Sequence, residues 1–98
     1  MKDLKYEGEF VNGKKNGKGE EYESFRNIKY IGEFINGKKN GKIKEYTFNY
    51  YNKGKYYKLI FEGEYLNNYR IKGKEYYKNG KLYFEGEYLF AKKWNGKI

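Results

Sequence analysis

The stretch Tyr6–Lys18 reads YEGEFVNGKKNGK and returns at Tyr30–Lys42 as YIGEFINGKKNGK, with 11 of 13 positions identical. Its first half returns as FEGEY at Phe61–Tyr65 and again at Phe84–Tyr88. The first aromatics of the four copies are 24, 31 and 23 residues apart. Internal repeats with a period of about 20 to 50 residues are typical of repeat architectures. The sequence therefore predicts a single domain over residues 1–98, built from units that start near residues 6, 30, 61 and 84.

The alternation within each copy predicts a β-strand. Successive side chains of a strand point to opposite faces, so the two aromatics of a copy share a face with the glycine between them. A glycine normally weakens a strand, and we expect these glycines to leave room for an aromatic ring from a neighbouring strand. The predicted structural core of the repeats consists of Tyr6, Gly8, Phe10, Tyr30, Gly32, Phe34, Phe61, Gly63, Tyr65 and Gly86.

Turn signals separate the predicted strands. Asn and Gly tolerate positive φ angles and mark tight turns. Strands separated by such signals every 8 to 12 residues or so, in a chain without proline, predict an all-β fold. We expect a single-layer, twisted antiparallel meander of stacked β-hairpins. The turns are predicted over residues 12–17, 26–27, 37–41, 52–54, 68–74 and 78–81.

Two segments depart from the repeat. On the strand predicted over residues 56–66, Tyr57 and Leu59 are expected to share the face of Phe61. Residues 90–96 are expected to form a turn and not a strand, which leaves the strand before them without most of its return partner. An exposed strand edge is a template for another chain, so we expect self-association there, or docking of a further repeat. This candidate self-association edge consists of Phe84, Tyr88, Phe90 and Trp94.

Composition narrows the classes of function. The 98 residues include 22 Lys and Arg against 13 Asp and Glu, for a net charge of +9, and neither Cys nor His occurs. Without these two residue types there are no disulfides, no thiolate chemistry and no ordinary zinc sites. The hydroxyls of Ser24 and Thr47 have no histidine to activate them. We therefore expect no enzyme activity, no cofactor and no small-molecule substrate.

Glutamates on the strands suggest a second face. Glu62 and Glu64, for example, lie two residues apart and point to the same side of a strand. Such pairs can do acid–base chemistry or bind a cation, but a solvated face with lysines opposite on neighbouring strands is the favoured interpretation. No segment approaches the ~18 apolar residues of a membrane span. We expect a cytoplasmic location, with peripheral contact to a membrane as the alternative.

Basic residues cluster at the predicted long turns. Such an edge can bind anionic lipid, at about 1 kcal/mol per Lys or Arg near the surface, or nucleic-acid phosphates. Lysines at hairpin tips also keep sheet edges soluble. The candidate anionic-ligand edge consists of Lys14, Lys15, Lys18, Lys38, Lys39, Lys42, Arg70, Lys72, Lys92 and Lys93.

The segment YEGEFVNGKKNGKGEEY resembles a MORN (membrane occupation and recognition nexus) repeat. The family pattern is a Tyr-x-Gly-x-aromatic strand, a glycine-containing turn and a Gly-x-Gly start to the return strand, which Gly17-Lys18-Gly19 matches. The second unit has Gly41-Lys42-Ile43 and lacks the second glycine, and the last two units diverge in the turn. The resemblance implies a sheet of stacked hairpins that scaffolds, dimerises or tethers near membranes, without catalytic residues of its own.

Three functions remain open at this point. The favoured prediction is a non-catalytic scaffold that mediates protein–protein association, including association with itself. The second is peripheral binding of anionic phospholipid membranes through the basic turns. The third is nucleic-acid binding, which the interleaving of aromatic and basic residues permits.

Overall fold

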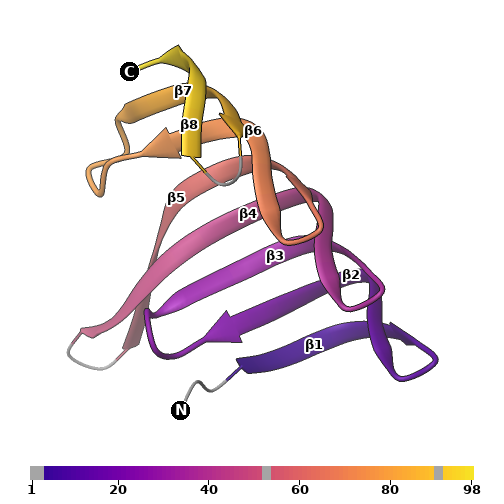
Figure 1. Cartoon of the computed structure of the whole chain (residues 1–98). Coiled ribbons are helices and arrows are strands. Elements are labelled where there is room, and N and C mark those ends of the chain that lie inside the picture. Colours follow the sequence, from indigo (N-terminus) through magenta and orange to yellow (C-terminus); the bar gives the residue numbers. More distant parts are fainter. Residues whose placement is uncertain (1–3, 52–53, 90–91) are drawn as a thin grey trace.

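The computed structural model describes residues 4–51, 54–89 and 92–98. These residues form one open sheet of eight antiparallel strands, and each strand pairs with its neighbours in the chain (Figure 1). The predicted all-β meander is confirmed. The strands are β1 (Leu4–Val11), β2 (Lys14–Glu23), β3 (Ile28–Ile35), β4 (Lys38–Tyr51), β5 (Gly54–Leu66), β6 (Tyr69–Tyr76), β7 (Leu82–Leu89) and β8 (Lys92–Lys97).

The turns that open the repeats are shorter than predicted. Asn12 and Gly13 have φ angles of 51° and 77°, and this two-residue left-handed turn leads directly into β2. The prediction of a turn reaching residue 17 is therefore wrong, and so is the prediction for residues 37–41, because β4 begins at Lys38. In the third unit, Asn67 and Asn68 make the turn, with φ angles of 48° and 74°.

The second Asn-Gly pair of each early unit builds a bulge within the return strand. Opposite it, the carboxylate of Glu9 accepts a hydrogen bond of 2.6 Å from the backbone N–H of Lys18. Glu33 accepts the equivalent bond of 2.7 Å from Lys42. Gly17 lies in this bulge with a φ angle of 97°, a backbone conformation that favours glycine over other residues. The turns predicted over residues 26–27 and 78–81 are confirmed, whereas residues 52 and 53 lie outside the described part of the chain.

A row of glycines crosses the sheet, one on each strand except β4, where Ile43 takes the position. The row consists of Gly8, Gly19, Gly32, Ile43, Gly63, Gly73, Gly86 and Gly96. A Cβ added at Gly73 would stand 2.7 Å from the ring of Phe61, and one at Gly19 would stand 2.5 Å from the ring of Tyr6. The predicted ring over a glycine is confirmed there. At Gly32 the space is filled instead by Ile43 and the backbone of β4.

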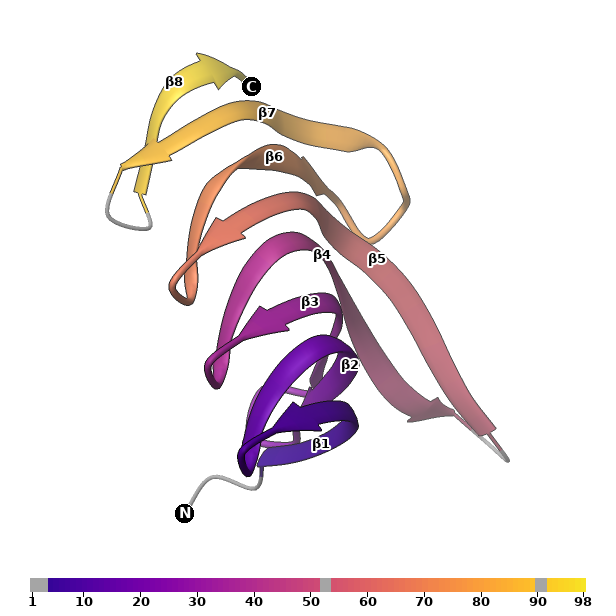
Figure 2. The ribbon, with the colours of Figure 1, turned by 90° about the vertical axis from the view of Figure 1, so that its right-hand side faces the viewer.

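Most of the hydrophobic core lies on one side of the sheet, the aromatic face, and the strands arch along their length (Figure 2). The buried hydrophobic residues of the aromatic face are Tyr30, Phe34, Ile43, Phe61, Tyr65, Phe84 and Tyr88, whereas Phe48 is buried on the opposite face. Phe10 was predicted to belong to this core, but 56% of it is exposed. The reason is its place on β1, the outermost strand of the sheet, where no strand of the described chain covers its far side.

The prediction that Tyr57 and Leu59 share the face of Phe61 is wrong. The pairing of β4 with β5 shifts by one residue between Glu45 and Tyr46, so Leu59 pairs with Tyr46 and the alternation is reset. Tyr57 consequently packs on the opposite face, its ring centroid 5.7 Å from that of Phe48.

The prediction that the last unit lacks a return strand is also wrong. β8 pairs with β7 from Leu89 opposite Lys92 to Glu85 opposite Lys97. Trp94 therefore lies on a strand and not in a turn, and 62% of it is exposed. Phe84 and Tyr88 of the candidate self-association edge are buried, and Phe90 lies outside the described residues.

Candidate functional site

A ladder of cations and carboxylates runs along the aromatic face. At the same position of each return strand, a cation stands over the rings: Lys15, Lys39, Arg70 and Lys93. Two residues beyond the glycine row, Glu21, Glu45 and Glu75 complete the inner ladder. Each of these carboxylates pairs with the cation of the following return strand, two strands away.

Arg70 is the centre of the inner ladder. Its Nε and Nη2 atoms lie 2.9 Å and 2.8 Å from the two carboxylate oxygens of Glu45, which makes the contact bidentate. Its Nη1 atom lies 3.4 Å from Glu75, and its guanidinium carbon lies 4.2 Å from the centre of the Phe61 ring. Glu45 is 2% exposed and also accepts a hydrogen bond from the Tyr65 hydroxyl. A buried carboxylate is tolerated here because each of its oxygens has a partner.

The same contacts recur with lysine in the outer units. Glu21 pairs with Lys15 and, at 3.2 Å, with Lys39. Burial alone would raise the pKa of the Glu21 carboxyl, but these two ammonium groups outweigh it and lower the pKa. Glu75 accepts a hydrogen bond from the Tyr88 hydroxyl and lies 3.4 Å from Lys93.

Burial and nearby carboxylates raise the pKa of the tyrosine hydroxyls on this face. Burial, reinforced by Glu45, raises the pKa of Tyr30 to about 12. Tyr65 and Tyr88 shift in the same direction, first because of burial and then because their hydroxyls donate to Glu45 and Glu75. Because the folded pKa values lie above the ordinary value of 10, these hydroxyls contribute stability below pH 10.

We expect the free energy of unfolding to fall as the pH rises from 10 towards 12 and beyond. The measurement is urea unfolding followed by circular dichroism across this range, with tyrosine ionisation recorded by ultraviolet absorbance. In the Tyr65→Phe variant the fall should be smaller, because one of the hydroxyls with a raised pKa is gone. A fall of equal size in the parent and in Tyr65→Phe would contradict this assignment.

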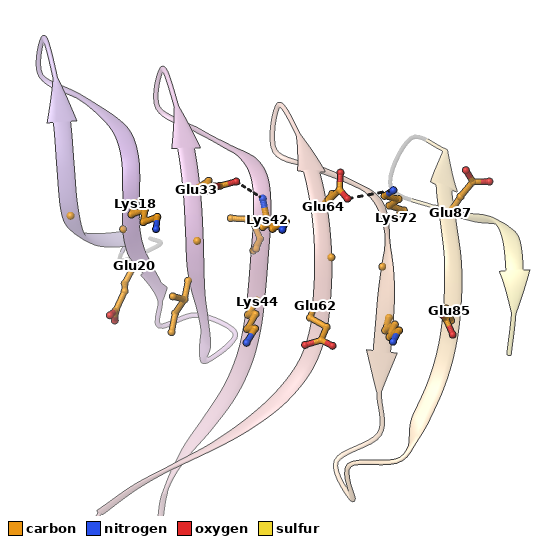
Figure 3. A pocket seen from close by; sticks show the side chains of 18 of the residues that line it. Lys18, Glu20, Glu33, Lys42, Lys44, Glu62, Glu64, Lys72, Glu85 and Glu87 are labelled. Atoms are coloured by element: carbon orange, nitrogen blue, oxygen red, sulfur yellow. Dashed lines mark hydrogen bonds and ion pairs between the residues drawn. The ribbon is translucent and has the colours of Figure 1, made fainter.

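The opposite side of the sheet carries a shallow groove of about 1070 Å³ along the glycine row. Its floor is the backbone of the glycines, and its walls are the residues immediately before and after each of them, which point away from the aromatic face (Figure 3). We call it the charged groove. Its charged residues are Glu7, Lys18, Glu20, Glu33, Lys42, Lys44, Glu62, Glu64, Lys72, Lys74, Glu85 and Glu87.

Charges of opposite sign face one another across neighbouring strands of the groove. Between β4 and β7 the strand register places Lys42 opposite Glu64, Glu64 opposite Lys72, and Lys72 opposite Glu87. The second wall runs in the same order, with Lys44, Glu62, Lys74 and Glu85 in register. The interpretation of the glutamate pairs as a solvated face with lysines opposite is thereby confirmed for these strands.

The ten residues of the candidate anionic-ligand edge divide into three groups. Lys15, Lys39, Arg70 and Lys93 belong to the inner ladder. Lys18, Lys42 and Lys72 line the charged groove. Lys14, Lys38 and Lys92 are the exposed first residues of β2, β4 and β8. The structure therefore does not gather the ten into one surface.

The inner ladder was not predicted, because the interpretation of the glutamates covered pairs such as Glu62 and Glu64 and gave no role to the carboxylates of the ladder. The available signal was position: Glu21 and Glu75 each stand two residues after a glycine of the row, and so share the face of its aromatics. The predicted turns hid the partners, because they included Lys15 and Lys39, which in the structure lie on return strands opposite Phe10 and Phe34.

In the described ranges, no helix is long and apolar enough to cross a membrane. Within the same ranges, no three side chains of His, Cys, Asp or Glu are grouped so that they could hold a metal ion.

The chain is a β-hairpin repeat protein. Its hairpins stack into one open sheet, which a glycine row and the inner ladder cross and whose other face is charged. A model of the MORN repeat family matches residues 6–22 and 30–42, and these two segments are MORN repeats. The MORN repeat is a module used in protein or membrane association, and MORN repeat proteins are generally non-catalytic. A search of the curated proteins found no match to the chain.

Proposed function

We propose that this chain is a non-catalytic interaction module, and that the charged groove receives a segment of a partner protein. The observation that carries the proposal is the build of the groove: a floor of glycine backbone between two walls of mixed charge. A binding site that joins a less polar floor to polar walls fits a polypeptide, which offers both kinds of surface.

The sign pattern favours a protein over a uniformly charged partner. The groove contains seven glutamates and five lysines, although the whole chain carries a net charge of +9. A nucleic-acid backbone in the groove would approach those carboxylates at close range, and like charges repel. A polypeptide with both signs of charge along its length can instead match the alternation, which gives specificity.

Anionic phospholipid remains the second candidate, on a different surface. The turns before β2, β4 and β6 follow one another along one side of the sheet (Figure 1). Lys14 and Lys38 are exposed beside two of them, and within the described ranges neither forms an ion pair with Glu21 such as Lys15 and Lys39 form. Two such lysines supply about 2 kcal/mol at a bilayer surface, which is weak binding compared with what a groove can provide.

The test is a selection of displayed random peptides against the intact chain, followed by fluorescence polarisation with synthetic copies at two salt concentrations. We expect the selected peptides to carry both signs of charge. Lys72→Glu, in the groove, should weaken their binding about tenfold or more, which corresponds to about 1.4 kcal/mol. The matched control Lys14→Glu makes the same charge change outside the groove and should leave the binding unchanged.

Failure to select any peptide would contradict the proposal, as would selected peptides that bind both variants equally well. Flotation with phosphatidylserine vesicles forms the second arm. Vesicle binding that is lost in a Lys14→Glu, Lys38→Glu double variant, in a protein that selects no peptide, would replace the proposal by the lipid candidate.

A further inference from the structure

We infer that this chain assembles head to tail with a second copy of itself, the outer edge of β8 in one copy pairing with the outer edge of β1 in the next. The sheet would continue across the junction as it does between consecutive repeats within the chain. This contact uses the outer edges of the two end strands. Of the charged residues of the groove only Glu7 takes part, so the contact does not depend on the proposed function.

The first observation is an unfilled place in the inner ladder. Each cation stands between the first aromatic of its own unit and the second aromatic of the next unit. Lys39 lies 4.2 Å from the ring centre of Tyr30 and 5.8 Å from that of Tyr65. Arg70 follows the same rule with Phe61 and Tyr88, at 4.2 Å and 5.7 Å.

At the end of the sheet, Lys93 lies 4.9 Å from the ring centre of Tyr83 and 5.5 Å from that of Phe84, both of its own unit. No following unit in the described chain supplies the second aromatic that Lys39 and Arg70 have. Phe10 is the reverse case: it is a second aromatic, and no return strand of the described chain precedes it to supply a cation. A head-to-tail junction brings these two together and completes the ladder, as cation–π contacts do at the internal junctions.

Exposure supports the same pairing. Phe34, Tyr65 and Tyr88 occupy the position of Phe10 in the later units, and each is at most 6% exposed because a return strand precedes its own. Phe10 is 56% exposed, with Trp94 of β8 at 62%. An exposed aromatic at a position that is buried wherever a neighbouring strand is present marks a surface for such a strand.

The glycine row and the charges set the register of the junction. Gly96 of β8 would face Gly8 of β1, which puts Lys97 opposite Glu7. This repeats the internal junctions, where Lys44 faces Glu62 and Lys74 faces Glu85 beside the glycine row. The strand direction also agrees, since β1 and β8 run in opposite directions in the meander and would pair antiparallel.

Symmetric pairing of like edges fits less well. Two β1 edges joined through Gly8 would oppose Glu7 of one copy to Glu9 of the other, and opposed like charges destabilise a sheet. Two β8 edges would leave both Phe10 side chains uncovered. The charge pattern therefore favours the junction of unlike edges, which is open and adds further copies.

The test is sedimentation velocity of the full chain over a range of concentrations. We expect the mean mass to rise continuously with concentration beyond that of a dimer. Phe10→Ala should weaken association about tenfold or more, whereas the matched control Val11→Ala should not. Val11 is 53% exposed on the same strand, but points to the other face.

A charge exchange then tests the register. Glu7→Lys places two lysines opposite each other at the junction and should weaken association, and adding Lys97→Glu should restore it. Circular dichroism confirms that each variant is folded. A strictly monomeric parent would overturn the inference, and so would a mass that stops at the dimer or a Phe10→Ala variant that associates like the parent. None of these association results decides whether the groove binds a peptide, and Phe10 lies outside the groove, so the two proposals fail separately.

Discussion

Gly63→Ala is expected to lower the free energy of unfolding by about 3 kcal/mol, although alanine has no strand disadvantage relative to glycine. The added Cβ would stand 2.5 Å from the Cα of Gly73 on β6 and 2.8 Å from the Phe61 ring. Real Cβ atoms do not approach backbone so closely, and the backbone of a paired strand cannot move aside without breaking its ladder. Urea unfolding followed by circular dichroism measures the loss.

The matched control is Gly80→Ala in the turn before β7. A Cβ at Gly80 would meet nothing within 4 Å, but its φ angle of 89° costs alanine about 1 kcal/mol. A loss at Gly63 clearly larger than that at Gly80 supports the steric account of the glycine row. Equal losses would mean that glycine serves the row only through backbone freedom.

Arg70→Ala is expected to lower the free energy of unfolding by about 3 kcal/mol or more. Removing the guanidinium leaves Glu45, which is 2% exposed, with the Tyr65 hydroxyl as its remaining hydrogen-bond donor among the described residues, and weakens the contacts of Glu75. A buried carboxylate that loses its cation pays the full cost of its dehydration. The ring of Phe61 also loses the guanidinium that covers it at 4.2 Å.

Arg70→Lys is the informative comparison, because lysine occupies this position in the other three units. This substitution keeps the charge but loses the bidentate contact with Glu45, so the free energy of unfolding should fall by about 1 kcal/mol. Lys14→Ala, which removes an exposed charge, should change stability by less than about 0.5 kcal/mol. If Arg70→Ala behaves like Lys14→Ala, the inner ladder does not stabilise the sheet.

The inner ladder also changes what the turn lysines can do. A charge reversal at Lys15 or Lys39 would place a second carboxylate next to that of Glu21 on the aromatic face, and the two would repel each other. Loss of ligand binding in such a variant would follow from a damaged fold as readily as from a lost contact. Lys14 and Lys38 are the positions at which a charge reversal tests the surface alone.

Much of the architecture is determined locally and could be predicted from the sequence. The aromatic-x-Gly-Glu-aromatic copies specify strands with two distinct faces, and the Asn-Gly pairs specify where hairpins turn, because side-chain alternation and positive φ angles are properties of a few adjacent residues. The four units, and the absence of helix from the described ranges, follow from such local rules.

The tertiary structure alone decided which residues meet across strands. Near Gly17 the pairing of β1 with β2 shifts by two residues within the strands, so Lys15 stands opposite Phe10 and not in a turn. A one-residue bulge between β4 and β5 moves Tyr57 away from the aromatic face. A one-residue bulge reverses every side chain beyond it, but its position depends on the register of two strands together. Burial of Glu45 beneath Arg70, 25 residues away, depends on that register. The exposure of Phe10 also depends on the tertiary structure, because β1 has a neighbouring strand on one side only in the described chain.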